Sequence, residues 1–131
     1  MSRAVRDTAA MIAGMAPVLD PRRWCFLAVT PDRAADLLGA AIATFREEEG
    51  VSAIVPAELA EEAPVFARIT LAVHSDLEGV GLTAAVAGTL AEAGIACNVV
   101  AALHHDHLFI PENRAQEALQ LLRKLAAAAQ G

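Results

Sequence analysis

The alternation of apolar and polar residues predicts a strand, a helix and a hairpin in the second half of the chain. Residues 66–74 alternate as a strand with one buried face does. The apolar period then changes to that of a helix, which should end at Gly94 because glycine is preferred just beyond a helix C-terminus. Two further strands are expected at 96–103 and 106–110, and Pro111 opens a last helix. The helix residues expected to face the core are Leu82, Val86, Leu90, Ala115, Ala118, Leu119, Leu122 and Ala126.

The joint between the first of these strands and its helix, residues 74–83, is the most specific local pattern in the chain. Ser75 and Glu78 have the spacing of a capping box, with Ser75 as the N-cap and Glu78 at position N3. Gly79 and Gly81 leave room for a ligand to approach the backbone N–H groups of a helix N-terminus. The pattern indicates either an anion-binding turn or a capped helix whose glycines permit close packing.

The first half of the chain is harder to interpret. Residues 23–30 predict a strand, and Pro31 starts a helix. Within residues 35–49, helical spacing of the apolar residues competes with a hairpin that turns at Glu49-Gly50. We favour the hairpin, with strands at 41–47 and 51–55 and a short helix at 57–62, because it gives both halves the same order of elements.

The order strand, helix, strand, strand, helix in each half is typical of the ferredoxin-like class of α+β folds. It implies an antiparallel sheet with helices on one face. Acidic residues and Pro64 separate the two halves, so the expected boundaries are 1–64 and 65–131. Each half lacks one strand of a complete βαββαβ unit, and we therefore expect strands to be shared between halves or paired between chains.

Composition and charge exclude several classes of function. The chain has a net charge of −6 and no stripe of Lys and Arg, which argues against a nucleic-acid partner. No apolar stretch has the character of a membrane span, because the one at residues 84–103 contains Gly88, Gly94 and Asn98 and changes its period. Cys25 and Cys97 lie in separate apolar runs, which indicates reduced thiols and a cytoplasmic protein.

Residues 69–111, ITLAVHSDLEGVGLTAAVAGTLAEAGIACNVVAALHHDHLFIP, resemble the small bacterial ACT-domain proteins with two ACT-like halves. Residues 43–50 (ATFREEEG) and 17–19 (PVL) resemble them as well. This family is similar to the pair of ACT domains that ends aspartokinases. The resemblance implies a dimeric module that binds an amino acid and regulates a partner protein. Gly79 and residues 102–104 depart from the usual pattern of the family.

The candidate ligand site combines the residues of the turn with those that the resemblance adds. At the turn, Gly79, Val80 and Gly81 are expected to offer N–H groups to a carboxylate, and Asp76 is expected to offer the counter-charge for an ammonium group. The resemblance adds the start of the strand that faces the turn. The full candidate set is Ser75, Asp76, Leu77, Gly79, Val80, Gly81, Leu82, Asn98 and Val99.

Catalytic and metal-dependent functions have less support in the sequence. His104, His105, Asp106 and His107 are consecutive, but on an extended chain only His105 and His107 share a face, and a zinc site needs three or four ligands. No catalytic triad or dinucleotide motif is present. We therefore expect a non-enzymatic, homodimeric module without a cofactor that binds an amino acid. The alternatives are a metal-binding protein or metal-dependent enzyme that uses this histidine cluster, and a purely structural assembly domain.

Overall fold

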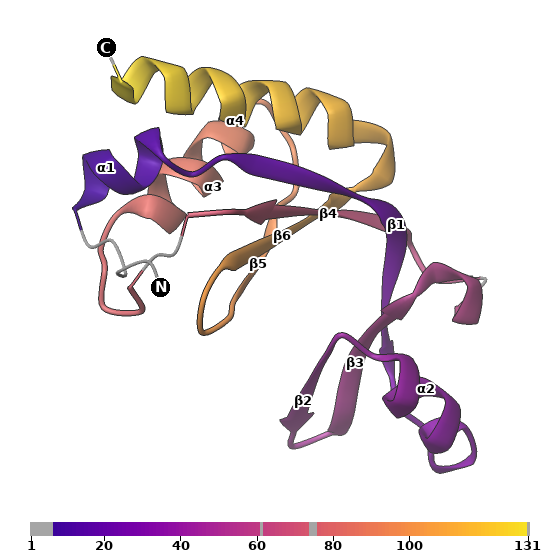
Figure 1. Ribbon diagram of the computed structural model, residues 1–131. Helices are drawn as coiled ribbons and strands as arrows, with labels where there is room; N and C mark the ends of the chain where they lie inside the picture. Colours follow the sequence, from indigo (N-terminus) through magenta and orange to yellow (C-terminus); the bar gives the residue numbers. More distant parts are fainter. Residues whose placement is uncertain (1–6, 61, 74–75, 131) are drawn as a thin grey trace. The chain divides into compact units, whose positions relative to one another are not determined.

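Two compact units make up the chain, and each is described by itself. The computed structural model describes residues 7–60, 62–73 and 76–130 (Figure 1). Unit 1 comprises Met1–Asp20 and Ala67–Gly131, and unit 2 comprises Pro21–Phe66. The strand β1 (Pro17–Ala28) therefore begins in unit 1 and continues into unit 2.

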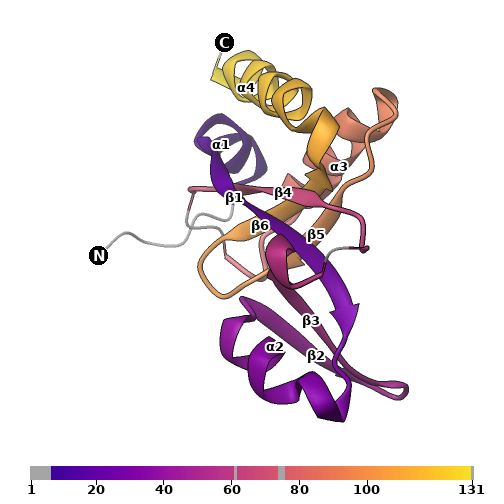
Figure 2. The ribbon, with the colours of Figure 1, turned by 90° about the vertical axis from the view of Figure 1, so that its right-hand side faces the viewer.

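Unit 1 is a sheet whose strand order is β1-β4-β6-β5, together with three helices. Strands β5 and β6 form an antiparallel hairpin in which Ala101 pairs with Asp106 and Val99 with Leu108. The elements are α1 (Thr8–Ala13), β4 (Phe66–Leu71), α3 (Leu82–Glu92), β5 (Asn98–Ala101), β6 (Asp106–Pro111) and α4 (Ala115–Gln130). Helix α1 contacts α4, and Gln130 Nε2 of α4 donates a hydrogen bond to the Ala13 carbonyl at 3.0 Å (Figures 1 and 2).

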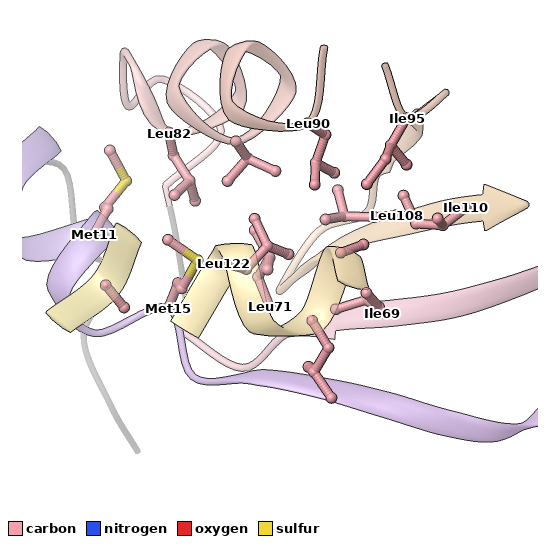
Figure 3. Packing of buried hydrophobic residues seen from close by; sticks show 14 residues of the cluster. Met11, Met15, Ile69, Leu71, Leu82, Leu90, Ile95, Leu108, Ile110 and Leu122 are labelled. Atoms are coloured by element: carbon pink, nitrogen blue, oxygen red, sulfur yellow. The ribbon is translucent and has the colours of Figure 1, made fainter. Parts of the chain in front are cut away.

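The core of unit 1 lies between one face of β4 and β6 and the helices. Ile69 and Leu71 point from β4 into this core because they alternate with the polar Arg68 and Thr70. Figure 3 shows the helix side chains meeting those of the strands, with two methionines at one end. The core residues of α3 and α4 are those that the sequence predicts: Leu82, Val86, Leu90, Ala115, Ala118, Leu119, Leu122 and Ala126.

The two ends of α3 differ in how well the sequence predicts them. Gly94 has φ of +71°, and the N–H groups of Gly94 and Ile95 donate to the carbonyls of Ala91 and Leu90, both at 2.9 Å. This is a Schellman motif, so the predicted C-terminal stop is confirmed. The predicted capping box is wrong, because Glu78 lies in a turn and α3 begins only at Leu82. Its proposed N-cap, Ser75, lies outside the described residues.

Unit 2 contains the hairpin that the sequence favours over a long helix. Strand β2 (Ala43–Glu47) pairs antiparallel with β3 (Gly50–Pro56), which also pairs with β1. A 3₁₀ turn, η1 (Pro31–Arg33), leads into α2 (Ala34–Ala40). In the described part of the expected helix at 57–62 there is only a 3₁₀ turn, η2 (Ala57–Leu59), whose single buried residue, Ala57, offers little apolar surface to hold a longer helix.

A small core closes unit 2 around Cys25, Leu37 and Val55. Trp24 is 1% exposed and has the Arg22 guanidinium 4.9 Å from its ring centroid. Both Cys25 and Cys97 are free thiols. The predicted α+β, ferredoxin-like class with antiparallel strands is confirmed. Within the described residues, no helix is long and apolar enough to cross a membrane.

Candidate functional site

The segment from Asp76 to Gly81 forms a tight turn ahead of α3. The Asp76 carboxylate accepts a hydrogen bond from the Glu78 N–H at 2.8 Å, and the Asp76 carbonyl accepts one from the Gly79 N–H at 2.9 Å. The first bond defines an Asx turn, in which the aspartate side chain competes with helix formation, and the second closes a β-turn. The turn delays the start of the helix until Leu82, and it also engages the Gly79 N–H that the sequence assigns to a ligand.

Helix α1 holds this turn in place. The Thr8 hydroxyl donates a hydrogen bond to the Val80 carbonyl. A Cβ atom on Gly81 would lie 2.6 Å from Thr8 Cγ2, and one on Gly79 would lie 3.2 Å from the Met11 sulfur. Gly81 is therefore needed for the close approach of α1 and is also required by its φ of +104°, whereas at Gly79 the flexible end of Met11 would have to shift by a few tenths of an ångström. Close packing, one of the two roles that the sequence indicates for these glycines, is therefore present in the structure.

Helix α3 begins after the turn, and the backbone N–H groups of its first residues are available to a ligand. The first hydrogen bond of the helix joins the Ala85 N–H to the Gly81 carbonyl at 2.9 Å. The N–H groups of Leu82, Thr83 and Ala84 consequently have no partner within the helix. Since α3 is 11 residues long, the partial positive charge of its dipole reinforces these three donors. This end of the helix is suited to a carboxylate.

A cavity of about 490 Å³ lies beside the N-terminus of α3. Its volume falls in the range of roughly 300–1,000 Å³ that is usual for small-molecule sites. Six of the predicted site residues line it, namely Asp76, Leu77, Gly79, Val80, Gly81 and Leu82. The remaining lining residues are Met11, Thr83, Ala84, Ala87, Ala101 and Asp106. All of them belong to unit 1.

Asn98 and Val99 lie on β5, at the edge of the sheet, and are not among the described residues that line the cavity. Val99 packs against the core of unit 1. Asn98 points to the other face, where its Nδ2 donates to the Phe109 carbonyl at 3.3 Å. The cavity instead meets the hairpin at the pair Ala101 and Asp106.

Asp106 is a site residue that the sequence interpretation missed. Its side chain is 8% exposed at the start of β6, on the same face as Leu108 and Ile110. Burial raises the pKa of its carboxyl, while the neighbouring His107 and His105 act in the opposite direction. The period of two along residues 106–110 is the signal that could have revealed it, since it puts an aspartate in line with two core residues.

The described histidines, His104, His105 and His107, belong to the same hairpin but do not line the cavity. His107 Nδ1 is 3.0 Å from Thr70 Oγ1 on the face of the sheet opposite the helices. Burial lowers the pKa of His107, and Arg68 and His105 add to this effect, whereas Asp106 opposes it. In the part of the chain that the structure describes, no three His, Cys, Asp or Glu side chains converge on one point as metal ligands would.

Unit 1 is thus an α+β module with a small, partly apolar cavity at a helix N-terminus. A model of the ACT domain family matches residues 3–70, and a second ACT domain model matches residues 67–124. The chain belongs to the ACT domain family. A search of curated protein sequences finds no match.

Solved structures share this fold. A protein of unknown function from Vibrio cholerae, described as a possible transport protein, is 41% identical over 87% of this chain and 92% of its own, with a TM-score of 0.75. The ligand-free regulatory subunit of aspartate kinase from Thermus thermophilus is 13% identical over 86% of this chain and 97% of its own, with a TM-score of 0.63. A protein from Agrobacterium tumefaciens is 18% identical over 79% of this chain and 81% of its own, with a TM-score of 0.61. At 13% and 18% identity, the last two show the fold alone.

Proposed function

We propose that this protein is a non-enzymatic regulatory module that binds an amino acid in the cavity beside the N-terminus of α3. The observation that carries the proposal is that one small cavity is lined both by helix N–H groups without a partner in the helix and by the carboxylates of two aspartates. An α-amino acid offers the complementary pair of charges, since its carboxylate suits Leu82, Thr83 and Ala84 and its ammonium suits an aspartate. Membership of the ACT domain family supports a ligand-binding role.

The mechanism follows from the elements that build the cavity. Helix α1, the turn at 76–81 and the start of β6 each contribute to its wall, so a bound ligand would favour the arrangement in which all three are docked. Such coupling typically amounts to about 1–3 kcal/mol. A cytoplasmic module of this kind would transmit the change to a partner protein.

We further propose that the protein is a homodimer built from two ACT-like halves per chain, residues 1–64 and 65–131. The exposed β5 lies at an edge of its sheet, and an unpaired edge is a surface to which a second copy can add a strand. Such pairing would place Asn98 and Val99, which lie outside the cavity, at the boundary between two copies. Sedimentation velocity of the purified chain tests this part, and a monomer at micromolar concentration contradicts it.

Thermal unfolding with each of the twenty amino acids tests ligand binding. A ligand at 100 times its dissociation constant stabilises the folded state by about 2.7 kcal/mol. At roughly 3–5 °C per kcal/mol for a chain of this size, one or two amino acids should raise the Tm by roughly 8–13 °C. Asp76→Ala should reduce that rise, whereas Asp36→Ala, at an exposed residue of α2, should leave it unchanged. Stabilisation by zinc alone, lost in His105→Ala, would instead support the metal-binding alternative.

A further inference from the structure

The start of β6 places a buried carboxylate in the wall of the cavity. The Asp106 side chain is 8% exposed and lies on the helix-covered face of the sheet. The structure gives this carboxylate no hydrogen-bond donor among the described residues. An aspartate this deeply buried normally has a partner, because burying an unpaired charge is costly. Among the described residues, no side-chain oxygen is both fully buried and without a hydrogen-bond partner, so the Asp106 oxygens keep some solvent contact. Since Asp106 lines the cavity, a positively charged ligand there can reach this carboxylate.

The other charged groups of the cavity point to the same kind of ligand. Among the described lining residues, the charged side chains are Asp76 and Asp106, and no Lys or Arg is present. One oxygen of Asp76 already accepts a hydrogen bond from the Glu78 N–H. Of the described lining residues, those at the helix N-terminus offer donors to a ligand carboxylate, and a second anionic group on the ligand would meet the like charges of Asp76 and Asp106.

We propose that Asp106 is the ammonium-binding group of this cavity, and that the cavity therefore selects α-amino acids whose side chains carry no negative charge. The inference rests on the proposed function and adds the residue that gives the selectivity. Asp76 closes the turn, and its role is to position the loop. The α-carboxylate lies at Leu82, Thr83 and Ala84, and the ligand side chain contacts the apolar wall that Leu77, Val80 and Ala87 contribute.

Paired ligands test this assignment because a 2-hydroxy acid differs from its amino acid only in having a neutral hydroxyl group in place of the ammonium group. The probes are alanine with lactate, leucine with 2-hydroxyisocaproate, phenylalanine with phenyllactate, and aspartate with malate, measured by calorimetry on the full chain at pH 8. A charge-assisted hydrogen bond contributes enough for the parent protein to prefer the best-binding amino acid by at least about tenfold over its 2-hydroxy partner. Aspartate and malate should bind most weakly.

Asp106→Asn keeps the size of the side chain and removes its charge. This variant should bind both members of a pair with similar, weak affinity, and it should fold at least as stably as the parent because a desolvated charge is lost. Glu92→Gln removes the same charge from an exposed residue at the far end of α3 and should keep the preference.

Three results would overturn the proposal. The first is an undiminished amino-acid preference in Asp106→Asn, and the second is tightest binding by aspartate. In both cases the proposed amino-acid function survives. The third is the absence of binding between the parent and any of the twenty amino acids, which overturns the proposed function together with the role of Asp106.

Discussion

Adding one methyl group at Gly81 should separate α1 from the turn that it holds. Gly81 has φ of +104° and ψ of −23°, a conformation that alanine adopts at a cost of roughly 1–3 kcal/mol. The new Cβ would also lie 2.6 Å from Thr8 Cγ2, closer than two carbon atoms can approach. If Thr8 moves away, the hydrogen bond from its hydroxyl to the Val80 carbonyl is lost, at about 1 kcal/mol.

The two terms together predict that Gly81→Ala lowers the free energy of unfolding by roughly 2–4 kcal/mol. Urea denaturation followed by circular dichroism measures this loss. Gly88→Ala is the matched control, because Gly88 lies inside α3 with open space around its Cα. There the same substitution should stabilise the protein by roughly 0.5–1 kcal/mol, since alanine loses less conformational entropy than glycine in a helix.

A double variant separates the clash from the backbone strain. Thr8→Ser removes the methyl group at 2.6 Å and keeps the hydroxyl, so it should recover part of the loss in Gly81→Ala while the cost of the positive φ remains. Equal stability of Gly81→Ala and the parent would refute both terms. If Thr8→Ser does not change the stability loss of Gly81→Ala, the contact with α1 is refuted as a cause and the backbone strain at Gly81 remains the explanation.

Three further predictions concern titration, packing and thiol reactivity. Burial lowers the pKa of His107, so as the pH falls below about 6.5 the histidine is protonated in the unfolded chain before it is protonated in the folded one, and the free energy of unfolding should drop between pH 7 and 5. His107→Gln should flatten this dependence. Curves of stability against pH that run parallel for the parent and His107→Gln would contradict the prediction. Leu90→Ala, at a fully buried residue, should cost roughly 2–5 kcal/mol in urea denaturation, whereas Leu38→Ala, at a residue 47% exposed, should cost far less; similar losses would disprove the assigned core. A disulfide reagent should modify the half-buried Cys97 slowly, because burial raises the pKa of its thiol, and should reach Cys25 only on unfolding; rapid labelling of two thiols in the folded protein would be inconsistent with this burial.

The sequence predicts the elements whose signals are local and repeated. Helix α3 is recognised from Leu82, Val86 and Leu90, and its end from Gly94, because three apolar residues at helical spacing and one glycine suffice. The hairpin of β5 and β6 has a comparable signal in the alternation along residues 106–110. The spacing of the apolar residues is enough to predict these elements without knowledge of their tertiary contacts.

Tertiary contacts decide what the sequence does not predict. Residues 75–78 match a capping box, yet the Asx turn at Asp76 and the packing of Gly81 on Thr8 move the start of the helix to Leu82. Helix α1 is only six residues long and is held by its neighbours rather than by its own propensity. The period of two along residues 106–110 indicates that Asp106 faces the core, but only the tertiary packing brings it into the same cavity as the N-terminus of α3.

Unit 1 is built from two segments that lie before and after unit 2 in the sequence, and this determines the order in which its parts become available during synthesis. Unit 2 is continuous in sequence, and the ribosome completes it before it has made β6 or α4. Met11 and Met15 emerge earlier still, but their core partners on α3 and α4 are translated later. The cavity wall to which Met11 contributes is therefore complete only when Asp106 has been made, and a nascent chain that stops before β6 lacks part of it.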